Sequence, residues 1–165
     1  MPIGHLKDII DQVPRETALL GLDVGKKSIG LALCVGGSSF ATPLYTVTRT
    51  KFTKDIQEIS KVIRDYEIGG YVLGLPINMD GSEGPRAQSI RDFAAEMLNY
   101  PDIFGPDPFI ALWDERLSTA SVEDFVDISV RKRKTRVNSK ASGLIDKLAA
   151  QHILQGAIEF VLRNA

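Results

Sequence analysis

Cysteine and histidine are scarce in this chain, and their scarcity excludes whole classes of site. Of 165 residues one is a cysteine, Cys34, and two are histidines, His5 and His152. A single thiol excludes an internal disulfide framework, and without a Cys/His cluster the chain lacks the ligands of a zinc site. We interpret both histidines, which stand alone in the sequence, as structural or surface residues. A metal site in this chain would have oxygen ligands instead.

The chain also lacks a long apolar run and an excess of charge. No stretch approaches the ~20 apolar residues of a membrane span, and the first 13 residues alternate in charge rather than form a secretory signal. We therefore expect no membrane association and a cytoplasmic protein. The net charge of −1 argues against a strongly basic coat protein for nucleic acid. It leaves room for an enzyme that holds nucleic acid with a local basic patch.

What the sequence does contain is typical of one globular domain. Its length suits a single domain with a core, as do the 44% hydrophobic and 25% charged residues. Continuous apolar runs predict strands, and apolar residues at helical spacing predict helices. The strands are expected at 17–24, 28–35, 40–48, 71–75 and 109–113, and the helices at 3–13, 54–66, 86–98, 119–128 and 140–162.

The order of these elements predicts an α/β fold. Short turns join the first three strands into an antiparallel meander, whereas helices join the later strands, as parallel strands require. We predict a mixed five-stranded sheet, a three-strand antiparallel meander plus two parallel strands, flanked by helices. A helical extension over residues 1–16 precedes the main domain, 17–165. The extension either docks on the surface or serves as a partner-binding arm.

Asp23 ends the first predicted strand of the main domain, between Leu22 and Val24. One interpretation is that its carboxylate caps the turn at Gly25. The apolar approach to the residue favours a functional role, because a buried charge needs a partner.

Glu115 follows the apolar run from Phe109 to Trp113 and stands in a strand-to-helix loop, where catalytic groups often lie. Strand alternation places it on the same face as Trp113, with Asp114 pointing away. The alternative is a solvent-facing glutamate paired with Arg116.

Asp146 stands in a core-facing position of the last predicted helix. The inward stripe of that helix runs through Asp146, Ala149, Ala150, Ile153, Ala157 and Phe160. The small alanines let the helix approach the sheet closely. A buried acid there costs several kcal/mol, roughly, unless it is paired or binds a metal. A salt bridge to a lysine is the alternative, but the adjacent Lys147 points elsewhere.

Three acids on two strand ends and one facing helix can surround a single volume. Mg²⁺ and Mn²⁺ prefer carboxylate ligands and keep water for a substrate. Such an ion lowers the pKa of an attacking water and offsets the charge of a phosphate. We therefore predict a Mg²⁺ or Mn²⁺ site of Asp23, Glu115 and Asp146 that hydrolyses phosphodiesters.

Basic and glycine-rich segments supply candidate phosphate contacts. The stretch 74–84 follows a strand and precedes a helix, and its glycines and Asn78 let the backbone approach a phosphate; a structured turn is the plainer interpretation. A basic run just before the Asp146 helix is either a phosphate grip or a solvated loop. The predicted nucleic-acid contacts are Lys26, Lys27, Asn78, Arg116, Arg131, Lys132, Arg133, Lys134 and Arg136.

Four motifs carry a resemblance to a known family. They are GLDVG at 21–25, GLPINMDG at 74–81, LWDERLST at 112–119 and DKLAAQHILQ at 146–155. In this order they are specific, and the chain resembles the YqgF-like family, described as Holliday-junction resolvases or pre-16S ribosomal RNA nucleases. The resemblance implies a ribonuclease H-like fold, catalytic metal-binding roles for Asp23, Glu115 and Asp146, and trimming of the 5′ end of pre-16S RNA during ribosome maturation.

The chain departs from its relatives at two places. The turn after Asp23 commonly reads Gly-Thr-Lys-Arg in the family, whereas this chain has Gly25-Lys26-Lys27-Ser28. A phosphate contact that the family's arginine makes would have to be made here by Lys26 or Lys27. Relatives also often carry an aspartate where this chain has Cys34 and Val35. The leading segment 3–13 lies outside the resemblance.

The alternatives for function differ in substrate and class. A Holliday junction resolvase acting on four-way DNA needs two sites and hence a dimer; the sequence alone fits a monomer or a weak dimer. A non-catalytic nucleic-acid-binding module is possible on the same fold, although retention of three acids argues against it. The Asp23-Val24-Gly25 stretch also resembles the phosphate loop of actin-like ATPases, but 165 residues leave no room for their second lobe.

Overall fold

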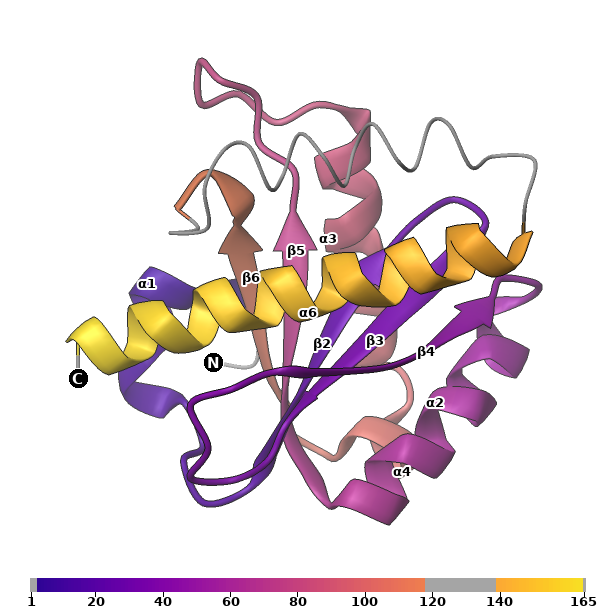
Figure 1. Cartoon of the computed structure of the whole chain (residues 1–165), viewed down its shortest axis with the longest axis horizontal. Helices are drawn as coiled ribbons and strands as arrows, with labels where there is room; N and C mark the ends of the chain where they lie inside the picture. Colours follow the sequence, from indigo (N-terminus) through magenta and orange to yellow (C-terminus); the bar gives the residue numbers. More distant parts are fainter. Residues whose placement is uncertain (1–2, 118–138, 165) are drawn as a thin grey trace.

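The computed structural model describes residues 3–117 and 139–164, with helix α6 described in its side chains from 144 onward. It is a sheet with helices on both faces (Figure 1). The strands are β1 (Ile3–His5), β2 (Ala18–Val24), β3 (Ser28–Cys34), β4 (Thr42–Thr48), β5 (Ile68–Leu75) and β6 (Phe109–Asp114). The helical segments are α1 (Leu6–Ile9), η1 (Ile10–Gln12), α2 (Phe52–Tyr66), α3 (Pro85–Met97), α4 (Pro101–Phe104), η2 (Glu115–Leu117) and α6 (Ser139–Asn164).

The sheet has the order β1-β6-β5-β2-β3-β4. Strands β2, β3 and β4 are antiparallel neighbours, and β2, β5, β6 and β1 run parallel. The mixed α/β architecture, the meander and the flanking helices are therefore as predicted. The predicted helix 119–128 and the basic run 131–136 lie outside the described residues.

The strand count is one higher than predicted, because the leading segment is not simply a helix. Ile3–His5 pairs parallel with β6, with Ile3 opposite Ile110, and helical structure is confined to residues 6–12. The apolar spacing did identify Leu6 and Ile9, which are buried. Without β1, strand β6 would be an edge strand with unpaired backbone N–H and C=O groups, and the three-residue strand β1 pairs with them. Hydrophobic periodicity cannot reveal such an edge.

The two faces of the sheet carry separate cores. One core joins Leu20, Leu22 and Leu73 to α2 and α3 through side chains such as Ile59 and Phe93. The other core joins Val72, Ala111 and Trp113 to α6 and α1, with Leu154 at its centre. This division follows from strand alternation, since successive side chains point to opposite faces.

Helix α6 crosses its face of the sheet diagonally (Figure 1), and glycines in three adjacent strands lie beneath it. A Cβ atom on Gly30 would stand 2.1 Å from the carbonyl oxygen of Asp146. On Gly21 it would stand 2.7 Å from Leu154 Cβ, and on Gly74 2.5 Å from Ile153 Cδ1. The helix thus lies on the sheet more closely than any side chain would allow.

Among the residues that the structure describes, no helix is both long enough and apolar enough to span a membrane.

The closeness of α6 to β3 can be tested with Gly30→Ala. Because the new methyl group meets helix backbone rather than a flexible side chain, α6 must shift, and we expect the free energy of unfolding to fall by about 2 kcal/mol or more. Urea unfolding followed by circular dichroism measures this loss. Gly84→Ala is the matched control, because its Cβ would meet nothing closer than 3.8 Å; an equal loss in both variants would contradict the packing argument.

Candidate active site at the carboxyl ends of the parallel strands

Asp23 lies one residue before the end of β2, opposite Gly30 of β3. Its side chain is half-buried and shares the face of Gly21, which is the face that α6 covers. On the other side of β2, Leu22 pairs with Leu73, so Gly74 lies beside Asp23. Asp23 therefore stands between two positions that have no side chain.

Glu115 begins the η2 turn directly after β6. Its Oε1 atom lies 2.7 Å from the position of a Cβ on Gly74, so the carboxylate folds back over β5 toward α6. The side chain is half-buried. The alternative of a solvent-facing pair with Arg116 does not describe this geometry, because Arg116 pairs with Asp114.

Asp146 faces the sheet from α6, as the helical stripe predicts. Its backbone rests on Gly30, and its Oδ2 atom accepts a hydrogen bond from the Ser28 hydroxyl at the start of β3. The side chain is half-buried, and Ala150, one turn later, is fully buried. Ser28 is a site residue that sequence reasoning missed, because nothing local marks a strand-starting serine as a partner for a helix 118 residues away.

The sheet register places the three predicted acids in a row along one edge of the sheet. Asp146 lies over Gly30, Asp23 lies on the next strand, and Glu115 lies over Gly74 on the strand after that. Strands are spaced about 4.8 Å apart, so Gly30 and Gly74 are roughly 10 Å apart with Asp23 between them. Three carboxylates along one such row are hard oxygen ligands suited to a divalent cation.

Within the described parts of the chain, no three His, Cys, Asp or Glu side chains are gathered closely enough to hold a metal ion. The donor chemistry fits such an ion, and the side chains of Asp23, Glu115 and Asp146 do share one edge of the sheet.

Cations stand beside this row. Lys26 and Lys27 are exposed in the turn between Asp23 and Ser28. Arg49 steadies that turn: its Nη1 atom donates to the carbonyl of Gly25 at 2.8 Å, and its backbone N–H donates to the carbonyl of Lys27 at 2.9 Å. Sequence reasoning did not single out Arg49, because a lone arginine after a strand carries no local signal. The predicted block of Arg131, Lys132, Arg133, Lys134 and Arg136 lies outside the described residues.

Arg116 is engaged on the opposite side of the β6 end from Glu115. Its Nη2 atom donates to Asp114 Oδ2 at 2.8 Å, and its backbone N–H donates to Asp114 Oδ1 at 3.0 Å. Burial raises the pKa of Asp114, but the hydrogen bonds from Arg116 outweigh it, so the pKa lies below the usual range for aspartate. Arg116 Nη1 also reaches the carbonyl of Asn78 at 3.3 Å. The arginine side chain remains 38% exposed.

The loop after β5, residues 76–84, is closed by its own hydrogen bonds. Asn78 N–H donates to the carbonyl of Ser82 at 2.9 Å, and Asp80 Oδ1 accepts from the Ser82 hydroxyl at 2.6 Å and from its N–H at 2.9 Å. Gly81 adopts a φ of 88°, which favours glycine. Asn78 is exposed in this loop, on the same edge of the sheet as the acids.

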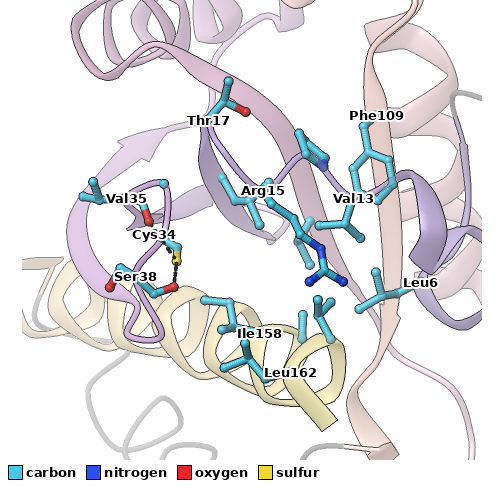
Figure 2. Close-up of a pocket in the computed structure, with 17 residues that line it drawn as sticks. Leu6, Val13, Arg15, Thr17, Cys34, Val35, Ser38, Phe109, Ile158 and Leu162 are labelled. Carbon is cyan, nitrogen blue, oxygen red and sulfur yellow. Dashed lines mark hydrogen bonds between the residues drawn. The ribbon is translucent and has the colours of Figure 1, made fainter. Parts of the chain in front are cut away.

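An apolar pocket of about 230 Å³ lies at the other end of the sheet (Figure 2). It is lined by the beginning of β2 and the end of β3, including Leu19 and Cys34, and by the last turns of α6. Burial raises the pKa of the Cys34 thiol, which donates to the carbonyl of Ser38. None of the predicted site residues lines this pocket.

Comparisons with known proteins agree with this geometry. The model of a family described as "RuvX: Holliday junction resolvase" matches residues 17–159. A protein of Rhodospirillum centenum named "Putative pre-16S rRNA nuclease" is 47% identical over 162 residues, covering 96% of this chain and 82% of that protein. One of the same name from Paramagnetospirillum magneticum is 44% identical over 159 residues, 96% of either chain.

Among solved structures, T. thermophilus RuvC in complex with a Holliday junction substrate matches with a TM-score of 0.55 and 14% identity, over 90% of this chain and 98% of that one. At this identity the likeness shows the fold alone. The ribonuclease H-like fold and the family that the four motifs predict are thereby confirmed.

The Asp114–Arg116 pair predicts a pH dependence of stability. A carboxylate whose pKa is lowered in the folded state stabilises it above the unfolded pKa of ~3.9, and this contribution is lost as the pH falls through the lower folded pKa. We therefore expect Asp114→Asn to destabilise the protein at pH 7 and the difference from wild type to shrink below about pH 4. Urea midpoints between pH 7 and pH 2.5 measure this, with Asp107→Asn, an exposed carboxylate, as control. A difference that is constant with pH would contradict the pairing.

Proposed function

Because the chain belongs to the RuvX family, described as Holliday junction resolvases, and relatives 44–47% identical to it are each named "Putative pre-16S rRNA nuclease", we propose that it is a metal-dependent nuclease that trims the 5′ end of pre-16S rRNA. The chain is a hydrolase that acts on nucleic acid. One observation carries the assignment of its site: Asp146, Asp23 and Glu115 stand along a single row at the edge where the parallel strands end. Ligand sites of open α/β sheets lie at such edges.

The three acids divide the work in this proposal. Asp23, in the middle of the row, would hold the metal together with Glu115 and Asp146 on either side, and one of these two would orient the water. Mg²⁺ or Mn²⁺ held there, as one ion or as a pair in the two-metal form, would supply a lower pKa for the attacking water and would offset the charge of the phosphate. Ser28 holds the Asp146 carboxylate in place through its hydroxyl hydrogen bond.

Basic side chains around the row are the proposed phosphate contacts. Lys26 and Lys27 are exposed in the turn after Asp23, and Arg116, which follows Glu115 in the chain, contacts the carbonyl of Asn78. Arg131, Lys132, Arg133, Lys134 and Arg136 belong to the same proposal. Residues 17–165 form the proposed nuclease domain, preceded by the segment 1–16.

The relatives favour RNA as the substrate. Those at 47% and 44% identity are named for pre-16S rRNA. Our proposal is that this chain also acts in ribosome maturation, in the cytoplasm, as a monomer or weak dimer. The second candidate is resolution of four-way DNA junctions. It is favoured by the description of the family and requires a dimer with two sites matched to a symmetric junction.

Substitution of the three acids tests the proposal. With Mg²⁺ or Mn²⁺ we expect the wild type to cut a pre-16S 5′-leader RNA, and Asp23→Asn, Glu115→Gln and Asp146→Asn each to lower the rate by more than about 100-fold, because loss of even an outer partner of a metal ligand costs 10- to 100-fold. Gel assays with each metal and with EDTA measure the rates, and Asp107→Asn, which leaves the row intact, is the control.

The same assay with a four-way DNA junction separates the two substrates. Cutting of the junction alone, by a dimer in sedimentation, would select the resolvase. Undiminished cutting by all three acid variants would overturn the assignment of the site, whichever substrate is cut. Binding of RNA without metal-dependent cutting, with every variant folded, would indicate a non-catalytic binding module.

A further inference from the structure

Met79 lies in the 76–84 loop, and its side chain is almost fully exposed to solvent. Its side chain is 92% exposed, more than any other large apolar side chain in the described residues. In Figure 1 this loop is the one that rises from the carboxyl end of β5, the strand between those that carry Asp23 and Glu115. Single exposed apolar side chains are common on protein surfaces, so it is the position of this loop on the same edge of the sheet as the acids that makes Met79 a candidate substrate contact.

The loop that presents Met79 is fixed rather than pliant. The residues on either side of Met79 are both tied to Ser82: Asn78 Nδ2 donates to Ser82 Oγ at 3.0 Å, and Asp80 Oδ1 accepts from the Ser82 hydroxyl at 2.6 Å. A second backbone bond, from Gly81 N–H to the carbonyl of Asn78, spans 2.9 Å. These hydrogen bonds hold the backbone on either side of Met79, whose side chain remains in solvent.

Arg116 joins this loop to the turn that carries Glu115. Its guanidinium donates both to Asp114, the residue before Glu115, and to the carbonyl of Asn78, the residue before Met79. Glu83 at the far end of the loop is held by Arg91 of α3, with Nε to Oε1 at 2.6 Å. The position of Met79 is thus coupled to that of Glu115 through a single side chain.

We propose that Met79 is a wedge that packs on a nucleobase next to the cleaved phosphate. The inference rests on the proposed nuclease function and adds the class of substrate: nucleic acid with unstacked or unpaired nucleotides at the cleavage position. Phosphates bound at the strand ends would bring their bases close to the 76–84 loop, which directly follows β5. Methionine is among the apolar side chains that proteins insert between base steps, and its thioether packs favourably on aromatic rings.

A fluorescent base tests the wedge directly. Leader RNAs that each carry 2-aminopurine at one unpaired position are titrated with the full-length protein, and fluorescence rises when the base loses its stacked neighbours. At the wedge position we expect a rise with wild type and with Met79→Leu, and none with Met79→Ala or Met79→Gln. The last two variants also bind and cut the RNA with a Kd and KM raised about five-fold or more, while kcat changes less, since base stacking contributes to affinity.

The chain offers a matched control in Phe40→Ala. Phe40 is also an exposed apolar residue, 73% exposed, but it precedes β4 at the other end of the sheet. Its removal should leave the fluorescence, Kd and KM unchanged. Because Met79 and Phe40 are both largely in water, these variants fold as the wild type does.

The outcomes separate the wedge from the nuclease. If the wild type cuts RNA and Met79→Ala shows the same fluorescence rise, Kd and KM, the wedge is overturned and the proposed nuclease function stands. The exposed methionine would then dock on protein. A fluorescence rise lost in Met79→Ala, in a protein that cuts nothing, supports the wedge and overturns the nuclease. Equal effects of Met79→Ala and Phe40→Ala would also overturn the wedge, because they would indicate general apolar adhesion.

Discussion

The close seating of α6 on the sheet is the constraint on which the site depends. Three neighbouring strands present Gly30, Gly21 and Gly74 to the helix, and a side chain at any of them would collide with it. The resulting contact does two things at once. It buries the apolar stripe of α6, and it brings the backbone of Asp146 against β3, one strand away from Asp23. An acid held this close to a core is stable only where polar partners meet it, and Ser28 supplies one.

The end of β6 serves both faces of the sheet through two adjacent acids. Strand alternation sends Trp113 and Glu115 to the α6 face and Asp114 to the other face. Glu115 can therefore join the row of acids because Asp114, rather than Glu115, takes up the guanidinium of Arg116. The 76–84 loop is fixed by the same arginine, so the turn after β6 organises both the carboxylate and the loop beside it.

Periodicity and motif order were enough to predict the meander, the long last helix, the two-faced α/β architecture and the family. They failed at β1, because the hydrogen bonds that make Ile3–His5 a strand come from the open edge of β6 and not from its own sequence. The acids were identifiable one by one from their apolar settings. The row that they form could not be predicted, since it depends on the strand register and on glycines that let α6 lie close to the sheet. Arg49 and Ser28 carry no local signal and emerged only from their contacts.

The distribution of charge explains how an almost neutral chain can approach a polyanion. The net charge is −1, so attraction cannot come from the chain as a whole. The acids are half-buried on strands and a helix, whereas Lys26 and Lys27 are exposed on the turn beside them. In the proposed function, phosphates would meet these lysines before the acids, and the attraction would act mainly within a Debye length of about 8 Å, because screening weakens it beyond that distance. Strands and a helix thus hold the acids proposed for hydrolysis, whereas a turn holds the lysines proposed to contact the substrate.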